Sequence, residues 1–453
     1  MEIQPNKKSI IVVGGGWSGL SCAVELSRLG FSVTVLESAR QLGGRARRVA
    51  FNDYSIDNGQ HVLIGAYRQT LALFRTLKIS FDQTMLRQNL DLHLLDQNRY
   101  KFNLRLPTLI TPLNLFVGLL QAKGFGFKDK WHALKFGFKL FSNSVVTGNG
   151  QHIDISVAEL LINQRQTSNA IKALWEPICL ASLNTPIEQA SANVFVRVLH
   201  DTFCRTRSDA DLILPSVDLG NLLPDPALDY VEKHGGNVHL SKRVTVVTTE
   251  QRHVTGVRCD TERYAADHVV LAIPPNACMP LVKEHPALHD VAYNLSAFDY
   301  NPIVTLYLKY PKNVKADHPI QALLGTTSQW VIDRSFAGQP GLIAVVISGP
   351  GPHMEQDNET LRKHIETEIA ESFPHWPAPD DVMIIREKRA TFNCRTGIDS
   401  LRPDNKTAIN GLWLAGDYTK TSYPATLESA VSSGRQVARL INDYELEQLD
   451  NNK

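Results

Sequence analysis

An α/β fold with a parallel sheet is predicted by the sequence, and three features near the N-terminus carry the prediction. Residues 10–13 form a short apolar run rich in β-branched side chains, which is typical of a buried parallel strand. A glycine-rich turn with the spacing G-x-G-x-x-G follows directly. Residues 20–29 then read as a helix and residues 31–36 as a second strand. This order predicts a Rossmann-like dinucleotide-binding unit.

Each glycine of the turn has its own expected role. Gly14 permits the tight turn, Gly16 lets the backbone approach a pyrophosphate, and Gly19 lets the helix pack on the strand. Glu37, at the end of the second strand, is placed to accept both ribose hydroxyls and would repel a 2′-phosphate, which disfavours NADP at this site. The alternative for Glu37 is a solvated charge at a strand end.

Composition excludes several classes of protein. The chain has 453 residues, enough for two or more domains, and its net charge of +1 gives no indication of a nucleic-acid partner. Its six cysteines have no metal-ligand spacing, so we expect reduced thiols in a cytoplasmic protein and no metal site. The N-terminus does not read as a signal peptide, and no apolar stretch reaches the roughly 18 residues of a spanning helix. If the protein meets a membrane, it lies on the inner face of the cell membrane as a peripheral protein.

A second glycine turn follows the predicted ribose-binding acid. Gly43, Gly44 and Arg45 can wrap a diphosphate from the other side, with backbone donors and a fixed positive charge. Further on, Gly59 can pass close to a flat ring because it has no side chain, and Gln60 and His61 follow it. His61 is a candidate for ring contact or proton delivery, or it is a structural histidine.

The middle of the chain loses the dinucleotide-binding pattern. Residues 104–120 are apolar and interrupted by prolines, and residues 127–141 predict a helix. The apolar side chains recur at helical spacing, at Phe127, Trp131, Leu134, Phe138 and Phe141, and they are accompanied by Lys128, Lys130, Lys135 and Lys139. Such a helix fits a membrane surface or the mouth of a lipid channel. It equally fits a helix that faces the core with solvated lysines.

Glu176 is the carboxyl group set among bulky apolar neighbours. Desolvation there would raise its pKa and allow it to act as an acid. Pro177 favours the alternative that Glu176 marks a helix start with a structural hydrogen bond.

From about residue 215 the dinucleotide-binding pattern returns. Residues 219–234 predict a helix and residues 237–273 a series of short strands, within which the backbone of Val244 is placed to pair with an adenine edge. Residues 277–394 predict a further insertion with one strong helix at 359–372, and residues 384–390 are expected to return to the first domain.

The last informative stretch is residues 411–438. A strand at 412–415 and a turn at Gly416 precede Asp417, which is suited to a ribityl hydroxyl. A helix from about residue 425 follows, and the backbone amides of Ala425 or Thr426 at its positive end can face the pyrimidine edge of a reduced flavin.

These motifs together resemble those of a known superfamily. GGGWSG, Glu37, LGGRAR, DNGQH and LAGD followed by PATLESAVSSG are similar to the motifs of FAD-dependent amine oxidases and phytoene desaturases. More narrowly, IDNGQHVLIGAYRQTL, LWEPICLASLNTP and YPATLESAVSSG resemble the squalene-associated FAD-dependent desaturases of bacterial hopanoid pathways, a family described as hydroxysqualene dehydroxylases.

The resemblance implies noncovalent FAD and a C30 isoprenoid substrate. It also implies reductive replacement of an allylic hydroxyl by hydrogen, with Glu176 and His61 as the candidate acids. Only one G-x-G-x-x-G occurs, so either NAD(P)H reduces the flavin transiently or another protein supplies electrons.

The rival activities are carotenoid desaturation and amine oxidation, the latter with Tyr418 and Tyr423 framing the flavin. A third rival is a non-catalytic escort protein for prenylated partners. The oligomeric state is not predicted.

The expected architecture is α/β, or α+β over the whole chain. Residues 1–82, 214–276 and 394–445 are predicted to form a discontinuous FAD-binding domain. Residues 83–213 and 277–393 are predicted to form the substrate-binding insertions, with helices that face a membrane, and residues 446–453 a flexible tail.

Overall fold

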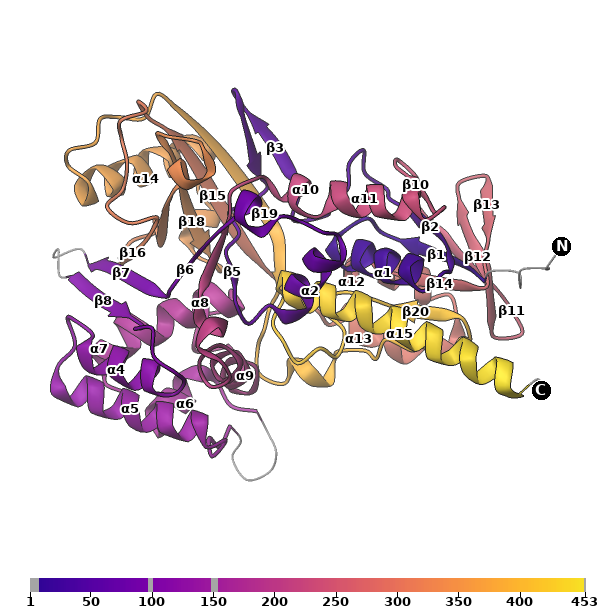
Figure 1. The fold of residues 1–453 in the computed structure, drawn as a ribbon, viewed down its shortest axis with the longest axis horizontal. Coiled ribbons are helices and arrows are strands. Elements are labelled where there is room, and N and C mark those ends of the chain that lie inside the picture. The colour runs from indigo at the N-terminus through magenta and orange to yellow at the C-terminus, as the bar shows by residue number, and fades with distance from the viewer. Residues whose placement is uncertain (1–7, 97–100, 148–153, 452–453) are drawn as a thin grey trace.

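The computed structural model describes residues 8–96, 101–147 and 154–451. A parallel five-stranded sheet organises one half of the molecule, on the right in Figure 1. Every pair of neighbouring strands in it runs parallel. The strand order is β10 (Asn237–His239), β2 (Ser32–Leu36), β1 (Ser9–Val13), β14 (His268–Leu271) and β20 (Leu412–Leu414).

Strand β1 lies in the middle of this sheet because its residues are apolar on both faces. Helix α1 (Trp17–Arg28) follows the glycine turn and packs against the long C-terminal helix α15 (Leu427–Asn451) (Figure 1). The two helices approach closely at Gly434, where a Cβ atom would lie 2.1 Å from the carbonyl oxygen of Ser18. The other helices of this half are α2 (Arg68–Thr76), α10 (Leu219–Leu222), α11 (Pro224–Lys233), α12 (Pro275–Val282) and α13 (His289–Ser296).

Three small sheets accompany the parallel sheet. The predicted short strands after residue 237 include an antiparallel meander of β11 (Val246–Glu250), β12 (His253–Cys259) and β13 (Glu262–Ala265). The other two sheets consist of β3 (Arg48–Phe51) with β4 (Tyr54–Asp57), and of β5 (Leu63–Ile64), β9 (Leu212–Pro215) and β6 (Met85–Gln88).

A seven-stranded mixed sheet forms the second half. Helix α14 (Asn358–Ser372), the helix predicted at 359–372, buries Leu361, Ile365 and Ile369 in the same apolar cluster as residues of this sheet. The strand order is β19 (Asp381–Phe392), β15 (Tyr300–Lys309), β18 (Leu342–Ser348), β17 (Trp330–Asp333), β16 (Ile320–Leu324), β7 (Asp91–Asp96) and β8 (Lys101–Arg105).

A group of helices lies beside this sheet, at the lower left of Figure 1. None of the helices within the described ranges is both long enough and apolar enough to cross a membrane. The group consists of α4 (Leu113–Gln121), α5 (Phe127–Phe141), α6 (Val157–Asn163), α7 (Ser168–Ala170), a π-helical turn (Ile171–Trp175), α8 (Glu176–Leu183) and α9 (Ala192–Phe203), while α3 (Phe81–Thr84) is a single turn before β6.

All five strands of the parallel sheet come from the three segments predicted for the cofactor domain, and β7, β8 and β15–β19 come from the two predicted insertions. The domain boundaries themselves stay a prediction. One detail of the prediction is wrong. Residues 384–390 were expected to return to the first domain, but they belong to β19, which pairs with β15 in the mixed sheet. Residues 446–451 of the expected flexible tail are part of α15, residues 452–453 lie outside the described part, and the flexibility of the tail stays a prediction.

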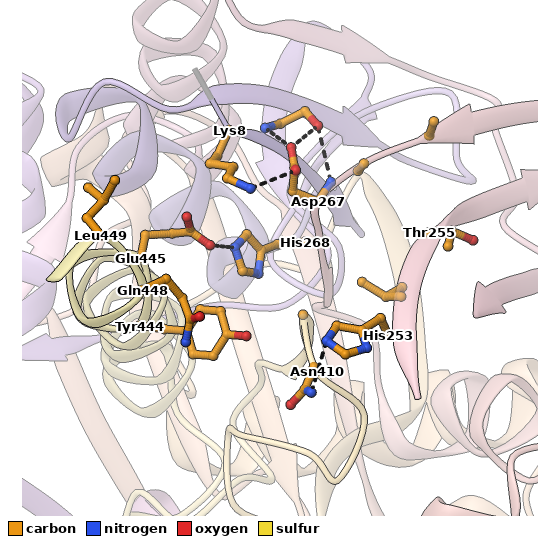
Figure 2. A pocket seen from close by; sticks show the side chains of 15 residues that line it. Lys8, His253, Thr255, Asp267, His268, Asn410, Tyr444, Glu445, Gln448 and Leu449 are labelled. Carbon is orange, nitrogen blue, oxygen red and sulfur yellow. Dashed lines mark hydrogen bonds and ion pairs between the residues drawn. The ribbon is translucent and has the colours of Figure 1, made fainter. Parts of the chain in front are cut away.

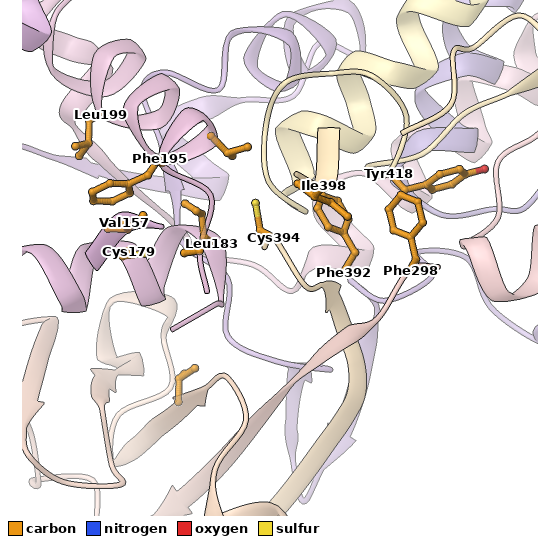
Figure 3. Packing of buried hydrophobic residues seen from close by; sticks show 14 of the residues in the cluster. Val157, Cys179, Leu183, Phe195, Leu199, Phe298, Phe392, Cys394, Ile398 and Tyr418 are labelled. Atoms are coloured by element: carbon orange, nitrogen blue, oxygen red, sulfur yellow. The ribbon is translucent and has the colours of Figure 1, made fainter. Parts of the chain in front are cut away.

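One hydrophobic cluster joins the halves. The ring of Phe298 meets Phe392 at 5.7 Å and Tyr418 at 6.1 Å, both edge to face, and the same cluster continues through Cys394 to Leu183 and Phe195 of the helical group (Figure 3). All six cysteines are buried and unpaired. The side chains on either side of this cluster are therefore held in one packed interior.

Candidate functional site

A cavity of about 490 Å³ lies at the carboxyl edge of the parallel sheet. Ligands of open α/β sheets bind at this edge, because the loops that follow the strands gather there. Its walls include the residues after β1, β2, β14 and β20, at Gly14, Glu37, Ala272 and Gly416. The walls also include residues of α8 and the mixed sheet, so both halves of the molecule shape it.

The first glycine turn has the backbone geometry expected of it. Gly14 has a φ of +108°, and its N–H donates to the Leu36 carbonyl at 2.8 Å. A Cβ atom on Gly19 would lie 1.9 Å from the Gly14 carbonyl oxygen, so only glycine allows the helix this close to the turn. A Cβ atom on Gly16 would meet only the Gly44 Cα, at 3.9 Å, which leaves open space for a ligand beside the backbone.

Glu37 is buried and holds the glycine turn rather than standing in solvent. Its carboxylate accepts the N–H of Gly15 at 2.6 Å and the N–H of Ala39 at 2.7 Å. Charge-assisted bonds of this kind are strong and fix the side chain. The solvated alternative is thus wrong, while the contact of Glu37 with a ribose stays a prediction.

The second glycine turn packs directly on the first. The Gly43 N–H donates to the Gly15 carbonyl at 2.9 Å, and Gly43 and Gly44 both have positive φ values. Arg45 reaches across the cavity, donating to Asp417 at 2.7 Å and to the Ala390 carbonyl at 2.8 Å. The two turns and the C-terminal acid, separated by more than 370 residues, therefore meet at one place.

The segment from residue 58 to residue 61 forms the next part of the wall. Gly59 has a φ of +151°, and the nearest atom to an added Cβ would be 3.7 Å away. The Gln60 side-chain oxygen accepts a bond from Arg334 Nη1 at 2.7 Å, and its amide donates to the His61 carbonyl at 3.2 Å. Arg334 is fully buried, so this bond fixes which way the Gln60 amide points.

His61 lines the cavity with its Nδ1 bonded to the Gly59 carbonyl at 2.7 Å. Burial lowers the pKa of His61, and the positive charge of Arg45 lowers it further, while the bond to Gly59 opposes them. In the neutral ring the proton lies on Nδ1, since a carbonyl can only accept it. Nε2 is then an acceptor in the neutral state and a donor only after protonation.

The C-terminal part of the wall is organised as expected up to the helix start. Gly416 has a φ of +158°, and an added Cβ would lie 2.4 Å from the Tyr418 ring. Helix α15 begins at Leu427, two residues later than expected, because the Thr426 hydroxyl caps it by accepting the Ser429 N–H at 3.2 Å. The Thr426 N–H already donates to the Pro424 carbonyl at 2.8 Å, so of the two predicted amides Ala425 is the better donor to a ligand.

Glu176 is the predicted acid that the structure supports least. It is the first residue of α8, as Pro177 indicates, and its side chain is exposed. Partial desolvation of its carboxyl group and the negative charge of Glu188 raise the pKa of Glu176, in the direction expected. The cavity wall instead takes Leu180, Ala181 and Ser182 from this helix.

Val244 is buried but is not part of the cavity wall. Backbone hydrogen bonds fix the residues around it. The Lys242 N–H donates to the Glu37 carbonyl and the Thr245 N–H donates to the Arg258 carbonyl, both at 2.8 Å. Between residues that the structure describes, the Val244 backbone makes no hydrogen bond. Its pairing with an adenine edge stays a prediction.

Sequence reasoning missed several polar residues of the site. Asn58 and Glu387 line the cavity and are bonded to each other at 3.1 Å, and Asn184 lines it from the end of α8 with a φ of +49°. Asn58 stands inside the DNGQH motif and could have been found there. Glu387 and Asn184 carry no such signal, because tertiary packing alone brings them to the cavity.

Arg402 was also missed, although it organises the loop that carries Asp417. It is 1% exposed, and all five of its N–H groups are used. They donate to the carbonyls of Asp417, Thr419 and Tyr423, the hydroxyl of Thr421 and the carboxylate of Asp399.

A second cavity, of about 650 Å³, lies at the opposite edge of the sheet (Figure 2). There the His268 Nε2 bonds to Glu445 at 2.8 Å, and its Nδ1 accepts the Trp413 indole N–H at 3.3 Å. Lys8 pairs with Asp267 at 3.1 Å. These charged groups are satisfied by one another and tie the strand starts to α15, so the cavity at the carboxyl edge is the candidate cofactor site.

Several known proteins resemble this chain over nearly its whole length. The chain is 26% identical to a hydroxysqualene dehydroxylase of Sinorhizobium fredii, over 96% of this chain and 98% of that protein. It is 24% identical to a probable zeta-carotene desaturase of Synechococcus elongatus, over 95% and 98%. Among solved structures, an oxidoreductase from Methanosarcina mazei matches with a TM-score of 0.76 at 15% identity, over 95% of this chain and 100% of that one. Cyclohexylamine oxidase from Brevibacterium oxydans matches with a TM-score of 0.73 at 15% sequence identity, over 98% of this chain and 100% of that one.

The family model described as flavin containing amine oxidoreductase matches residues 17–442. This range begins just after Gly14 and Gly16 and includes the cavity-wall residues from Trp17 to Ala430. The predicted α/β fold, the FAD cofactor and the oxidoreductase class are thereby confirmed. This chain belongs to the flavin containing amine oxidoreductase family and is an FAD-dependent enzyme.

Proposed function

We propose that this enzyme reductively removes the hydroxyl group of hydroxysqualene to give squalene. The observation that best supports the proposal is the nearly full-length similarity to three proteins named hydroxysqualene dehydroxylase. A C30 isoprenoid alcohol needs a long apolar surface with few polar groups. The cavity has apolar walls beside its polar end, from Val62, Leu180, Ile273 and Ile303.

The residues of the cavity fit FAD. The open space beside Gly16 and Gly44 lets backbone N–H groups approach a diphosphate, and Arg45 adds a positive charge. Glu37 would accept ribose hydroxyls, and Asp417 a ribityl hydroxyl. We propose noncovalent attachment, since no cysteine occurs within residues 411–438. Reduced FAD, when bound, supplies a hydride.

The rest of the chemistry falls to the protein. Protonation of the allylic hydroxyl breaks the C–O bond, water leaves with the bonding electrons, and an allylic cation that accepts hydride remains. Apolar walls keep bulk water from capturing this cation. We retain His61 as the proton donor, because it lines the cavity whereas Glu176 is exposed.

The test is product analysis of the purified, FAD-loaded protein given hydroxysqualene and dithionite without oxygen. Squalene is expected, and omission of the reductant should abolish it. Replacing dithionite by NADH or NADPH tests whether a nicotinamide serves as electron donor. Failure to form squalene, with the flavin still reducible, would refute the proposal.

Carotenoid desaturation is the second candidate, because relatives named zeta-carotene desaturase match at 22–24% identity. A desaturase would take hydride from a polyene, so zeta-carotene should bleach oxidised flavin in the absence of oxygen. Tyr418 and Tyr423 do not form the aromatic pair expected for amine oxidation, since only Tyr418 lines the cavity and the Tyr423 hydroxyl is bonded to Asp201.

A further inference from the structure

Helix α5 exposes its apolar stripe. Phe127 is 82% exposed, Trp131 49%, Phe138 61% and Phe141 42%. Successive members of this set are four, seven and three positions apart, and these spacings place them on one side of the helix. The opposite side is buried and consists of Asp129, Ala133, Phe136, Gly137 and Leu140. The helix is thus fully packed on one side, and a second apolar side remains uncovered.

Helix α4 extends this uncovered surface. Ile110, just before it, is 74% exposed, and Leu113 and Leu120 are 51% and 57% exposed. The Lys130 ammonium of α5 donates to the Leu120 carbonyl at 2.7 Å, which places the end of α4 beside the start of the α5 stripe. We call the surface formed by Ile110, Leu113, Leu120, Phe127, Trp131, Phe138 and Phe141 the α4–α5 face.

Positive charge borders the α4–α5 face. Lys128, Lys135 and Lys139 are exposed on α5, and the Lys135 ammonium lies 5.1 Å from the Trp131 ring centroid. The one acidic residue of α4 and α5, Asp129, is buried on the inner side. Exposed aromatic residues bordered by lysines without exposed carboxylates match the surface of an anionic bilayer.

We infer that the α4–α5 face docks the enzyme on anionic lipid bilayers. The aromatic side chains enter the interface between headgroups and acyl chains, and the lysines meet the lipid phosphates. A second copy of the chain suits this surface less well, because a symmetric contact would bring the two sets of lysines together.

The docking surface is connected to the cavity wall by packing. The ring of Phe136, on the inner side of α5, meets Trp175 edge to face at 5.3 Å. Trp175 directly precedes α8, which supplies Leu180, Ala181 and Ser182 to the wall. If the proposed function holds, the surface that meets the bilayer is packed against the helix that supplies part of the cavity wall. Docking itself does not depend on that function.

Co-sedimentation of the FAD-loaded enzyme with vesicles tests the inference. Vesicles of 30% phosphatidylglycerol in phosphatidylcholine should pellet the wild type, and pure phosphatidylcholine should pellet much less. Replacing Lys128, Lys135 and Lys139 by glutamine should lower partitioning about 100-fold, from about fivefold for each lysine near the surface. The F127S/W131S/F138S variant should lower it by about 100-fold or more. Tyr293→Ser, at a residue 74% exposed on α13, is the matched control and should change nothing.

Flavin absorbance and circular dichroism establish that each variant is folded, so lost binding reports on the surface. Wild type that stays in the supernatant with anionic vesicles would overturn the inference. So would variants that sediment as well as wild type. Light scattering tests the alternative that a second copy of the chain covers the α4–α5 face. If wild type is a dimer and the F127S/W131S/F138S variant is a monomer, the face is an interface between two copies and the inference is overturned.

Discussion

Replacing Arg402 by lysine should weaken FAD binding strongly, although the residue lies outside the cavity wall. Arg402 holds the loop from Asp417 to Tyr423 by its backbone carbonyls, at 2.7–2.9 Å. Lysine keeps the charge but has three donors in place of five, and it lacks the planar fork. At least two of the five bonds must be lost.

The size of the effect follows from these bonds. A hydrogen bond to a charged group contributes about 1.5–3 kcal/mol net, so two lost bonds give about 3–6 kcal/mol. The Asp399 side chain is 49% exposed, and the bond to it contributes little. We therefore expect the lower end, about 3 kcal/mol. If that cost falls on the conformation of the loop, the Kd of FAD rises about 100-fold.

Titration of the apoprotein with FAD, followed by quenching of flavin fluorescence, measures this Kd. Arg263→Lys, at an exposed arginine of β13, is the control and should leave the Kd unchanged. The melting temperature of each apoprotein shows whether the loss is local or global. A Kd for Arg402→Lys within twofold of wild type would refute the view that this loop depends on Arg402.

Three other substitutions test two residues of the site, Glu37 and His61, and one buried carboxyl group outside the cavity wall, Asp57. Glu37→Gln removes the charge that binds the Gly15 N–H and the expected ribose, so FAD affinity should fall about 10–100-fold in the same titration; undiminished flavin retention on dialysis would refute the role. For His61, whose pKa is lowered by burial, turnover should rise as the pH falls toward that pKa, because only the protonated ring can donate. His61→Gln should flatten this rise, and a persistent one would assign the acid elsewhere. Burial raises the pKa of Asp57 from 3.8 to about 6, so its contribution to stability is present below pH 4 and lost as the pH rises through 6. The free energy of unfolding of Asp57→Asn, measured with urea, should increase relative to that of wild type by up to about 3 kcal/mol as the pH rises from 4 to 7.5. A difference between variant and wild type that does not change with pH would contradict this.

The cofactor end of the site could be predicted because short-range backbone geometry determines it. Gly14 and Gly19 are required by one turn and one helix–strand contact within a few residues, so spacing alone identifies them. Glu37 follows from the length of a single strand–helix–strand unit. Arg45 and Asp417 were each predicted separately as cofactor ligands, but their ion pair at 2.7 Å could not be, because it depends on how distant segments pack.

The substrate end was less predictable for the same reason. Glu387 reaches the cavity from β19, whose residues 384–390 were expected in the first domain but lie in the mixed sheet. Arg402 stands in a polar loop whose sequence has no motif, and its importance comes from five acceptors that only the folded loop presents. Glu176 was predicted as a candidate acid because its neighbours in sequence are apolar. In the structure it is the first residue of α8, and its side chain is exposed.

The orientation of α5 shows what periodicity leaves undetermined. The spacing of its aromatic residues identifies a stripe, but a stripe can face the core or the exterior, and the sequence left both open. The structure selects the exterior because the inner side carries its own packing and a satisfied carboxylate. Asp129 accepts bonds from the Thr167 hydroxyl at 2.5 Å, the Asn169 amide at 2.7 Å and the Gly126 N–H at 2.8 Å. Turning the helix over would expose Phe136 and leave these donors without their acceptor, so the aromatic stripe faces the exterior.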